Sequence, residues 1–188
     1  MTLKTSSLFM PVAAILAAAV VAPAPAQQGW QRYTQNGLSA EFLGEPERFD
    51  KWTDIAKGRV IQLTETRRDG AGDLKAFYFL QAVIADQPYD AGAKIAGDIA
   101  EAKGGGDVAV SKEFVSQRAL KPSEMPLPGM RGTELVYRYG GFGGGGQLET
   151  ARNMYVGNKW LSVSVRHGEG DDHAAERARF FRSVTWQP

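Results

Sequence analysis

Residues 147–167 read QLETARNMYVGNKWLSVSVRH and indicate the class of the fold. From Leu161 to Val165 apolar and polar residues alternate, a period of two that is typical of a half-buried strand. Gly157-Asn158 favours a two-residue hairpin turn between this strand and the one before it. Three consecutive strands are therefore predicted, over 131–139, 147–156 and 159–167.

Strand patterns also dominate the first half of the chain. Asn36-Gly37 is a tight-turn dipeptide, and the segment from Arg59 to Arg68 is rich in β-branched residues. The segment from Leu74 to Ala85 is apolar almost throughout, which predicts a central strand buried on both faces. The further strands expected lie over 31–34, 38–43, 59–68, 74–85, 108–119 and 184–186.

Two segments have the period of a helix instead. Asp90 is an expected N-cap for a helix over 90–103, and Gly104 is expected to end it in the left-handed conformation. Asp171 or Asp172 is expected to cap a final helix that runs to about Arg182. The predicted fold is α+β, a largely antiparallel sheet of about seven strands with the mid-chain and C-terminal helices packed on it.

The N-terminal segment has the pattern of a secretory signal peptide. A single charge, Lys4, precedes an apolar run from Leu8 to Val21, and Ala24-Pro25-Ala26 then offers a small-residue cleavage site. At 14 residues the run is shorter than the roughly 20 that span a bilayer, which disfavours an uncleaved anchor. We expect cleavage after residue 26, or slightly earlier after Ala24, and a single domain over 27–188 in the periplasm or the secreted fraction.

Composition excludes several functional classes. The 188 residues contain no Cys, which excludes disulfides, thiolate metal sites and a thiol nucleophile. Without Lys4 the Lys and Arg residues fall from 22 to 21 and equal the 21 Asp and Glu residues. A neutral domain has no overall electrostatic attraction to nucleic acid or to an anionic membrane. No nucleic-acid partner, and no membrane partner after cleavage, is therefore expected; the oligomeric state stays open.

Three segments carry a resemblance to a known superfamily. They are YTQNGLSAEF (33–42) followed by Gly44-Glu45-Pro46, the helix from Asp90, and RFFRSV (179–184) before the last strand. In this order the chain resembles the PsbP-like α/β superfamily, which also contains the Ran-binding Mog protein. The resemblance implies a non-catalytic binding or assembly module, and it carries no site residue onto this chain.

Both histidines lie in one short segment, HGEGDDH (167–173). Imidazole and carboxylate are acceptable ligands for zinc, nickel or copper, so His167, Glu169, Asp171 and His173 are candidate metal ligands. Their spacing matches no standard zinc motif, and acidic residues before a helix serve equally well as caps. The sequence therefore favours a capped loop and no cofactor.

Two other patterns point weakly to chemistry. The glycines at 141, 143 and 146 match G-x-G-x-x-G, but a strand rather than a helix is expected after them, which disfavours a dinucleotide site. Ser162 or Ser164 with His167 would give a hydrolase pair, but no nucleophile elbow is present. No coherent catalytic set remains, so we expect a protein that is not an enzyme.

The three late strands carry aromatic residues and arginines, the residue types enriched at protein interfaces. The interaction candidates are Tyr137, Tyr139, Phe142, Trp160 and Arg166. The alternative is that the aromatic rings are core and the arginines its solvated rim. The leading hypothesis is an exported, non-enzymatic module that binds another envelope protein. The alternative hypothesis is a small-ligand or metal-binding protein that uses the loop over 167–173.

Overall fold

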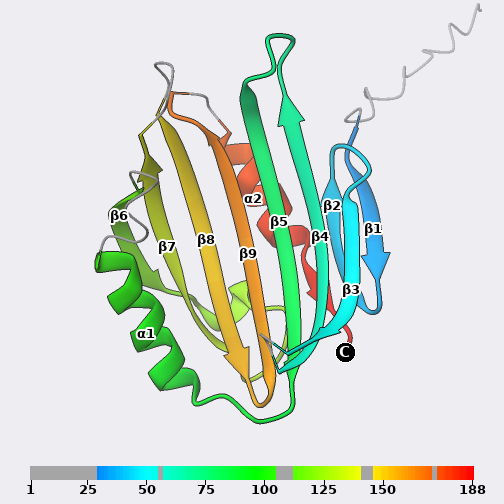
Figure 1. Ribbon diagram of the computed structural model, residues 1–188, viewed down its shortest axis with the longest axis vertical. Helices are drawn as coiled ribbons and strands as arrows, with labels where there is room; N and C mark the ends of the chain where they lie inside the picture. The colour runs from blue at the N-terminus through cyan, green and yellow to red at the C-terminus, as the bar shows by residue number, and fades with distance from the viewer. Residues whose placement is uncertain (1–28, 55–56, 105–111, 141–145, 171–172) are drawn as a thin grey trace, which may run out of the picture.

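A computed structural model describes residues 29–54, 57–104, 112–140, 146–170 and 173–188 (Figure 1). The expected signal peptide, Phe142 and Asp171 lie outside the described residues. The elements in chain order are β1 (Gln31–Gln35), β2 (Leu38–Phe42), β3 (Glu47–Thr53), β4 (Gly58–Arg68), β5 (Leu74–Ala85), α1 (Ala91–Lys103), β6 (Lys112–Ala119), a short 3-10 helix (Pro122–Glu124), β7 (Arg131–Tyr139), β8 (Gln147–Val156), β9 (Lys159–Gly168), α2 (Ala174–Ser183) and β10 (Thr185–Trp186).

The strands form two antiparallel sheets, and the predicted α+β class is confirmed. The larger sheet has seven strands in the order β3-β4-β5-β9-β8-β7-β6, and the smaller has the order β1-β2-β10. Figure 1 shows α1 on one face of the larger sheet, beside its β6 edge, and α2 on the other face. No helix within the described residues is long and apolar enough to cross a membrane.

The Asn36-Gly37 turn joins β1 to β2 as predicted. Both residues have positive φ angles, 46° and 80°, which is the conformation that a two-residue hairpin turn requires. A Cβ atom on Gly37 would also clash with the backbone carbonyl oxygen of Gln187. Glycine is therefore required here by its conformation and by the close passage of the C-terminal segment.

Gly37→Ala is expected to lower the free energy of unfolding by about 2 kcal/mol. About half of this loss is the strain of an L residue at positive φ, and the rest is the displacement of the Gln187 backbone by the new Cβ atom. Urea denaturation checks the loss, and Gly157→Ala is its control. Gly157 also has a positive φ, 53°, but a Cβ there meets nothing. Equal losses for the two variants would show that conformation alone matters and that the contact with Gln187 does not.

The core lies between the two sheets. Leu63, Leu80 and Val163 point from the large sheet toward Phe42 of the small sheet and Phe180 of α2, and all five are buried. Strand alternation explains this, since residues of like parity along β4, β5 and β9 share one face. Apolar burial on this face is the main stabilising contribution to the fold.

The opposite face of the large sheet is only partly covered. Among the contacts of the described elements, α1 packs against β6, β7 and β8, where Ala102, Leu135 and Tyr137 form a second small core. The expectation that β5 is buried on both faces is wrong for this reason. Phe77 and Phe79 of β5 remain partly exposed, because α1 packs on β6, β7 and β8 and leaves this part of the sheet open.

The helix ends confirm one expectation and correct two. Asp90 caps α1, with its Oδ1 accepting from the backbone N–H of Ala93 at 3.0 Å. Gly104 has a φ of −74°, so it is not the left-handed cap that was expected. The N-cap of α2 is His173, without a side-chain capping bond, rather than Asp171 or Asp172. Burial on α2 falls on Phe180, Phe181 and Ser183.

Candidate functional site

A groove of about 490 Å³ lies on the partly covered face of the large sheet, beside α1. Phe77 and Phe79 of β5 and Trp160 of β9 contribute aromatic rings to its floor, and Asp98 and Glu101 of α1 contribute carboxylates to its wall. The volume is within the range of about 300–1,000 Å³ that is usual for ligand sites. The groove therefore combines aromatic surface with negative charge.

Small side chains in the middle of the sheet leave the space for this groove. Along one row of paired residues, Phe79 of β5 is followed by Ser164 of β9, Ala151 of β8 and Leu135 of β7. The two small residues lie between two large ones, and this row crosses the groove floor. In the neighbouring row Ser162 and Asn153 add polar groups.

Three residues connect the floor to the acidic wall. The rings of Trp160 and Tyr155 are stacked, with centroids 6.3 Å apart and an interplanar angle of 8°. The hydroxyl of Tyr155 donates to Oδ2 of Asp98 at 2.7 Å. Burial raises the pKa of the Asp98 carboxyl above its usual range, although the Tyr155 hydrogen bond acts in the opposite direction. The carboxylate of Asp98 is thus fixed in place at the edge of the floor.

Two cations of the chain lie near Glu149 and Tyr137, which line the groove. The Arg166 guanidinium lies 4.0 Å over the Tyr139 ring and donates to Glu149 at 3.0 Å, and the Tyr139 hydroxyl donates to the same carboxylate at 2.6 Å. The Lys112 ammonium lies 3.7 Å from the centroid of the Tyr137 ring. Burial raises the pKa of Tyr137 to about 12, so its hydroxyl stays neutral.

The structure brings four of the five sequence-predicted interaction candidates to one face. Tyr137 and Trp160 line the groove, and Tyr139 and Arg166 pair with Glu149, which also lines it. Phe142 lies outside the described residues. Sequence reasoning missed the lining residues that come from elements distant in the chain, namely Phe77 and Phe79 of β5, Asp98 and Glu101 of α1 and Lys112 of β6.

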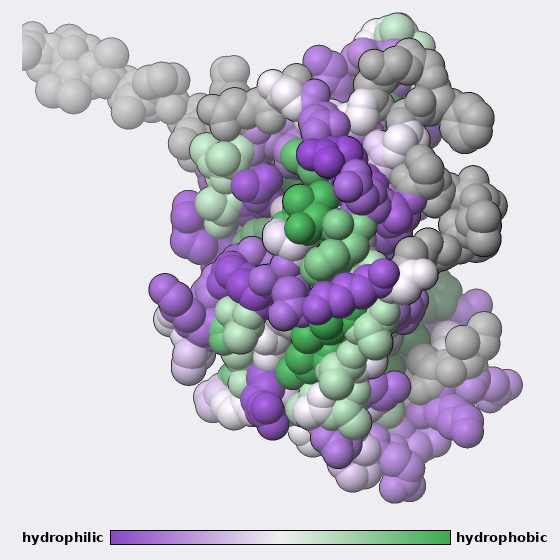
Figure 2. Space-filling model, turned by 90° about the vertical axis from the view of Figure 1, so that its left-hand side faces the viewer, coloured by the Kyte–Doolittle hydropathy of each residue, from purple (hydrophilic) through white to green (hydrophobic). Residues whose placement is uncertain are grey.

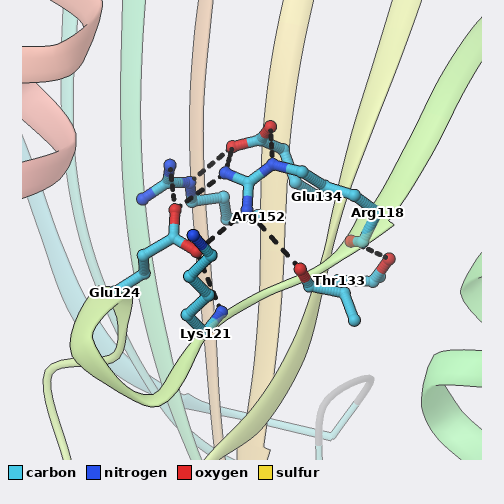
Figure 3. A network of polar contacts seen from close by, with 7 residues as sticks. Arg118, Lys121, Glu124, Thr133, Glu134 and Arg152 are labelled. Carbon is cyan, nitrogen blue, oxygen red and sulfur yellow. Dashed lines mark hydrogen bonds and ion pairs between the residues drawn. The ribbon is translucent and has the colours of Figure 1, made fainter.

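The arginines of the late strands divide between the two faces. Arg166 lies on the groove face, whereas Arg152 pairs on the opposite face with Glu134 at 2.8 Å and Glu124 at 3.1 Å. Arg118 of β6 binds the same two carboxylates at 2.7–2.8 Å (Figure 3). Both guanidiniums hold the pKa of Glu124 at about 2, together with the Lys121 backbone N–H. This network fixes the 3-10 helix to the sheet and is structural.

Apolar surface is also present on the β6 side of the molecule. Figure 2 shows hydrophobic side chains in a hollow there, crossed by a band of hydrophilic ones. A cavity of about 350 Å³ includes Ile95 and Ile99 of α1, Leu120, Met125 and Met130 among its lining residues. No charged group gathers in it as in the groove, apart from Arg131, so it indicates no particular ligand.

The loop candidates for a metal site are engaged elsewhere. His167 is buried; its Nδ1 lies 2.9 Å from the Gly168 carbonyl and its Nε2 lies 3.1 Å from an Nη1–H of Arg177. Because Arg only donates, Nε2 accepts and Nδ1 carries the proton. Glu169 pairs with Arg138 at 2.9 Å, and His173 pairs with Glu176 at 2.9 Å.

These pairings disfavour the metal-binding alternative. In the part of the chain that the structure describes, no three His, Asp or Glu residues are grouped to hold a metal ion. Ser162 and Ser164 lie on the groove face and His167 on the core face, so they form no hydrolase pair. The segment after the glycine run is the strand β8, and no helix N-terminus is there for a dinucleotide.

Comparisons with known proteins give a likeness in fold. No family model matches the chain, and no curated protein matches it. Among solved structures, it is similar to PA94 from Pseudomonas aeruginosa, a protein of unknown function proposed to be a regulator. The TM-score is 0.51 at 10% identity, over 85% of this chain and 99% of that chain. At this identity the likeness concerns the fold alone.

Proposed function

We propose that the chain is an exported, non-enzymatic module that binds another protein of the cell envelope through the groove beside α1. The observation that carries this proposal is the group of aromatic side chains on a sheet face that α1 leaves open. Phe77, Phe79 and Trp160 offer large, rigid contact area there. Such aromatic residues supply most of the binding energy in many protein interfaces.

Two further observations support binding rather than catalysis. The groove serines have no histidine on their side of the sheet within the described residues, since His167 faces the core and His173 contacts it across that face. Glu149 is engaged by Tyr139 and Arg166. The signal-peptide pattern of the sequence supports a partner in the envelope or outside the cell.

The proposal is tested with a photo-crosslinking residue in place of Ser162, in the middle of the groove floor. In living cells this position is expected to trap one specific envelope protein upon illumination. The same crosslinker in place of Arg182, which is exposed on α2, is the matched control and is expected to trap none. Identical products at both positions, or none at Ser162, would contradict the proposal.

Removing the rings is expected to abolish this crosslink. The double variant Phe77→Ala/Phe79→Ala takes away two partly exposed, stacked side chains whose centroids are 6.3 Å apart. We expect at least a tenfold lower yield of the crosslinked product, a loss typical of interface hot spots. Circular dichroism is expected to show an intact fold, because both side chains lie outside the core between the sheets. An unchanged yield would show that the groove is not the interface.

A further inference from the structure

Asp98 and Glu101 form the acidic wall of the groove. Asp98 and Glu101 are three residues apart on α1, so they lie on neighbouring positions of one helix face. Neither takes part in an ion pair among the described residues. Glu149, in the same groove, differs in this respect, since Arg166 binds it at 3.0 Å. No direct ion pair therefore neutralises the wall; Lys94, one turn before Asp98 on α1, attracts its charge without pairing with it.

Lys94 lies beside the wall and Lys112 lines the groove, but both place their ammonium groups over aromatic rings instead of pairing with Asp98 or Glu101. The Lys112 ammonium lies 3.7 Å from the Tyr137 centroid, and the Lys94 ammonium lies 5.7 Å from that of Tyr89. Each gains cation–π attraction in that position. Asp98 is bound instead by the neutral hydroxyl of Tyr155 at 2.7 Å, which orients the carboxylate without cancelling its charge.

The floor next to the wall suits a planar cation. Phe77, Phe79 and Trp160 line the same groove as Asp98 and Glu101. Within the described chain, the cation–π contacts are made by other rings, and none involves these three. A guanidinium stacks on aromatic faces, is weakly hydrated and binds carboxylates through two parallel N–H groups. Lysine shares the charge and the attraction to rings, but it is strongly hydrated and lacks the planar group with two parallel donors.

We propose that the groove receives an arginine side chain from the partner protein, stacked on the aromatic floor and paired with Asp98 and Glu101. This inference rests on the proposed function and names the chemistry that the partner presents. The partner's arginine would pair with Asp98 and Glu101 in the way that Arg166 pairs with Glu149. Arg166 lies over the Tyr139 ring and binds the groove carboxylate Glu149, which shows that stacking and pairing fit together on this face of the sheet.

The probe is a capped six-residue peptide of alternating arginine and leucine, titrated into the protein purified after expression of the full chain. Its control is the same peptide with citrulline for arginine, which keeps the shape and hydrogen-bonding groups but not the charge. Calorimetry is expected to show that the arginine peptide binds about tenfold more tightly than the citrulline peptide. Raising the salt concentration from about 0.05 to about 0.5 M is expected to weaken the binding of the arginine peptide but not that of the citrulline peptide.

Asp98→Asn/Glu101→Gln is expected to remove that tenfold difference. Glu101→Gln alone is expected to remove part of the tenfold difference in affinity. This single variant keeps the hydrogen bond from Tyr155 to Asp98, so its smaller loss of binding cannot be attributed to misfolding. Glu45→Gln neutralises a carboxylate that is 79% exposed and lies in the β2–β3 connection, and it is expected to bind like the wild type. Equal binding of the two peptides, or no effect of the double variant, overturns the inference.

The photo-crosslink at Ser162 separates this inference from the proposed function. Loss of the crosslink in Phe77→Ala/Phe79→Ala but not in Asp98→Asn/Glu101→Gln leaves a binding groove that needs no arginine, and overturns the inference alone. Loss in both variants supports both proposals. Retention in both overturns both.

Discussion

Phe180→Ala is expected to lower the free energy of unfolding by about 3–5 kcal/mol. The ring of Phe180 is fully buried between the two sheets. It packs edge-on against Phe42 at 5.3 Å and Tyr78 at 5.1 Å. The loss combines the transfer of the ring from water with a cavity that these neighbouring rings cannot close.

Urea denaturation followed by circular dichroism measures the loss. Phe79→Ala is the control, since it removes the same side chain from the open face of the sheet, where burial is partial. We expect it to cost about 1 kcal/mol, in proportion to the smaller apolar area withdrawn from water. Similar losses for both variants would show that the two faces contribute equally and that the core does not lie between the sheets.

The contrast between these two phenylalanines also shows where sequence reasoning stops. In Leu74–Ala85 aromatic residues stand at both parities, so the run appears buried on both faces. Lys75 and Gln81 have the parity of Phe77 and Phe79, which was the available signal that this face is partly open. Whether a helix covers this face of β5 depends on where α1 packs, which the local sequence pattern does not predict.

The small sheet depends on long-range pairing in the same way. The end segment was predicted as a strand, and Thr185 pairs with Ser39, close to the other end of the described chain. Local pattern predicts each strand but not this partnership, because the paired residues are far apart in sequence. The same limit applies to the groove: its Tyr137 and Trp160 were predicted as candidates, but Asp98 reaches it only through the packing of α1.

Core and groove occupy opposite faces of the same strands, and this separates stability from binding. Val163 of β9 contributes to the core, and Ser162 and Ser164 on either side of it face the groove. Substitutions at the groove positions therefore change the binding surface with little cost to packing between the sheets. The same alternation explains how a sheet of modest size carries both a stabilising face and a recognition face.

The Arg118–Glu124–Glu134–Arg152 network predicts the second large effect. Glu124→Gln is expected to lower the free energy of unfolding by about 2–3 kcal/mol at pH 7, less than the roughly 3–5 kcal/mol for a fully buried pair, because Arg118 is 43% exposed. Glu124 is 22% exposed and binds both Arg118 and Arg152, which is only 13% exposed (Figure 3). Glu113→Gln is the control, because that carboxylate is 67% exposed and pairs with Arg138 at 3.2 Å. It is expected to cost under about 0.5 kcal/mol.

The loss in Glu124→Gln is expected to shrink as the pH falls. The network lowers the pKa of Glu124 from 4.5 to about 2 in the folded protein. A carboxyl with a lowered pKa in the folded state stabilises the protein above its unfolded pKa and ceases to do so as the pH falls through the folded one. The wild type and the variant should therefore converge between pH 4.5 and about 2. Urea denaturation at steps of pH measures this, and a constant difference down to pH 2 would mean that Glu124 stabilises the fold through its shape rather than its charge.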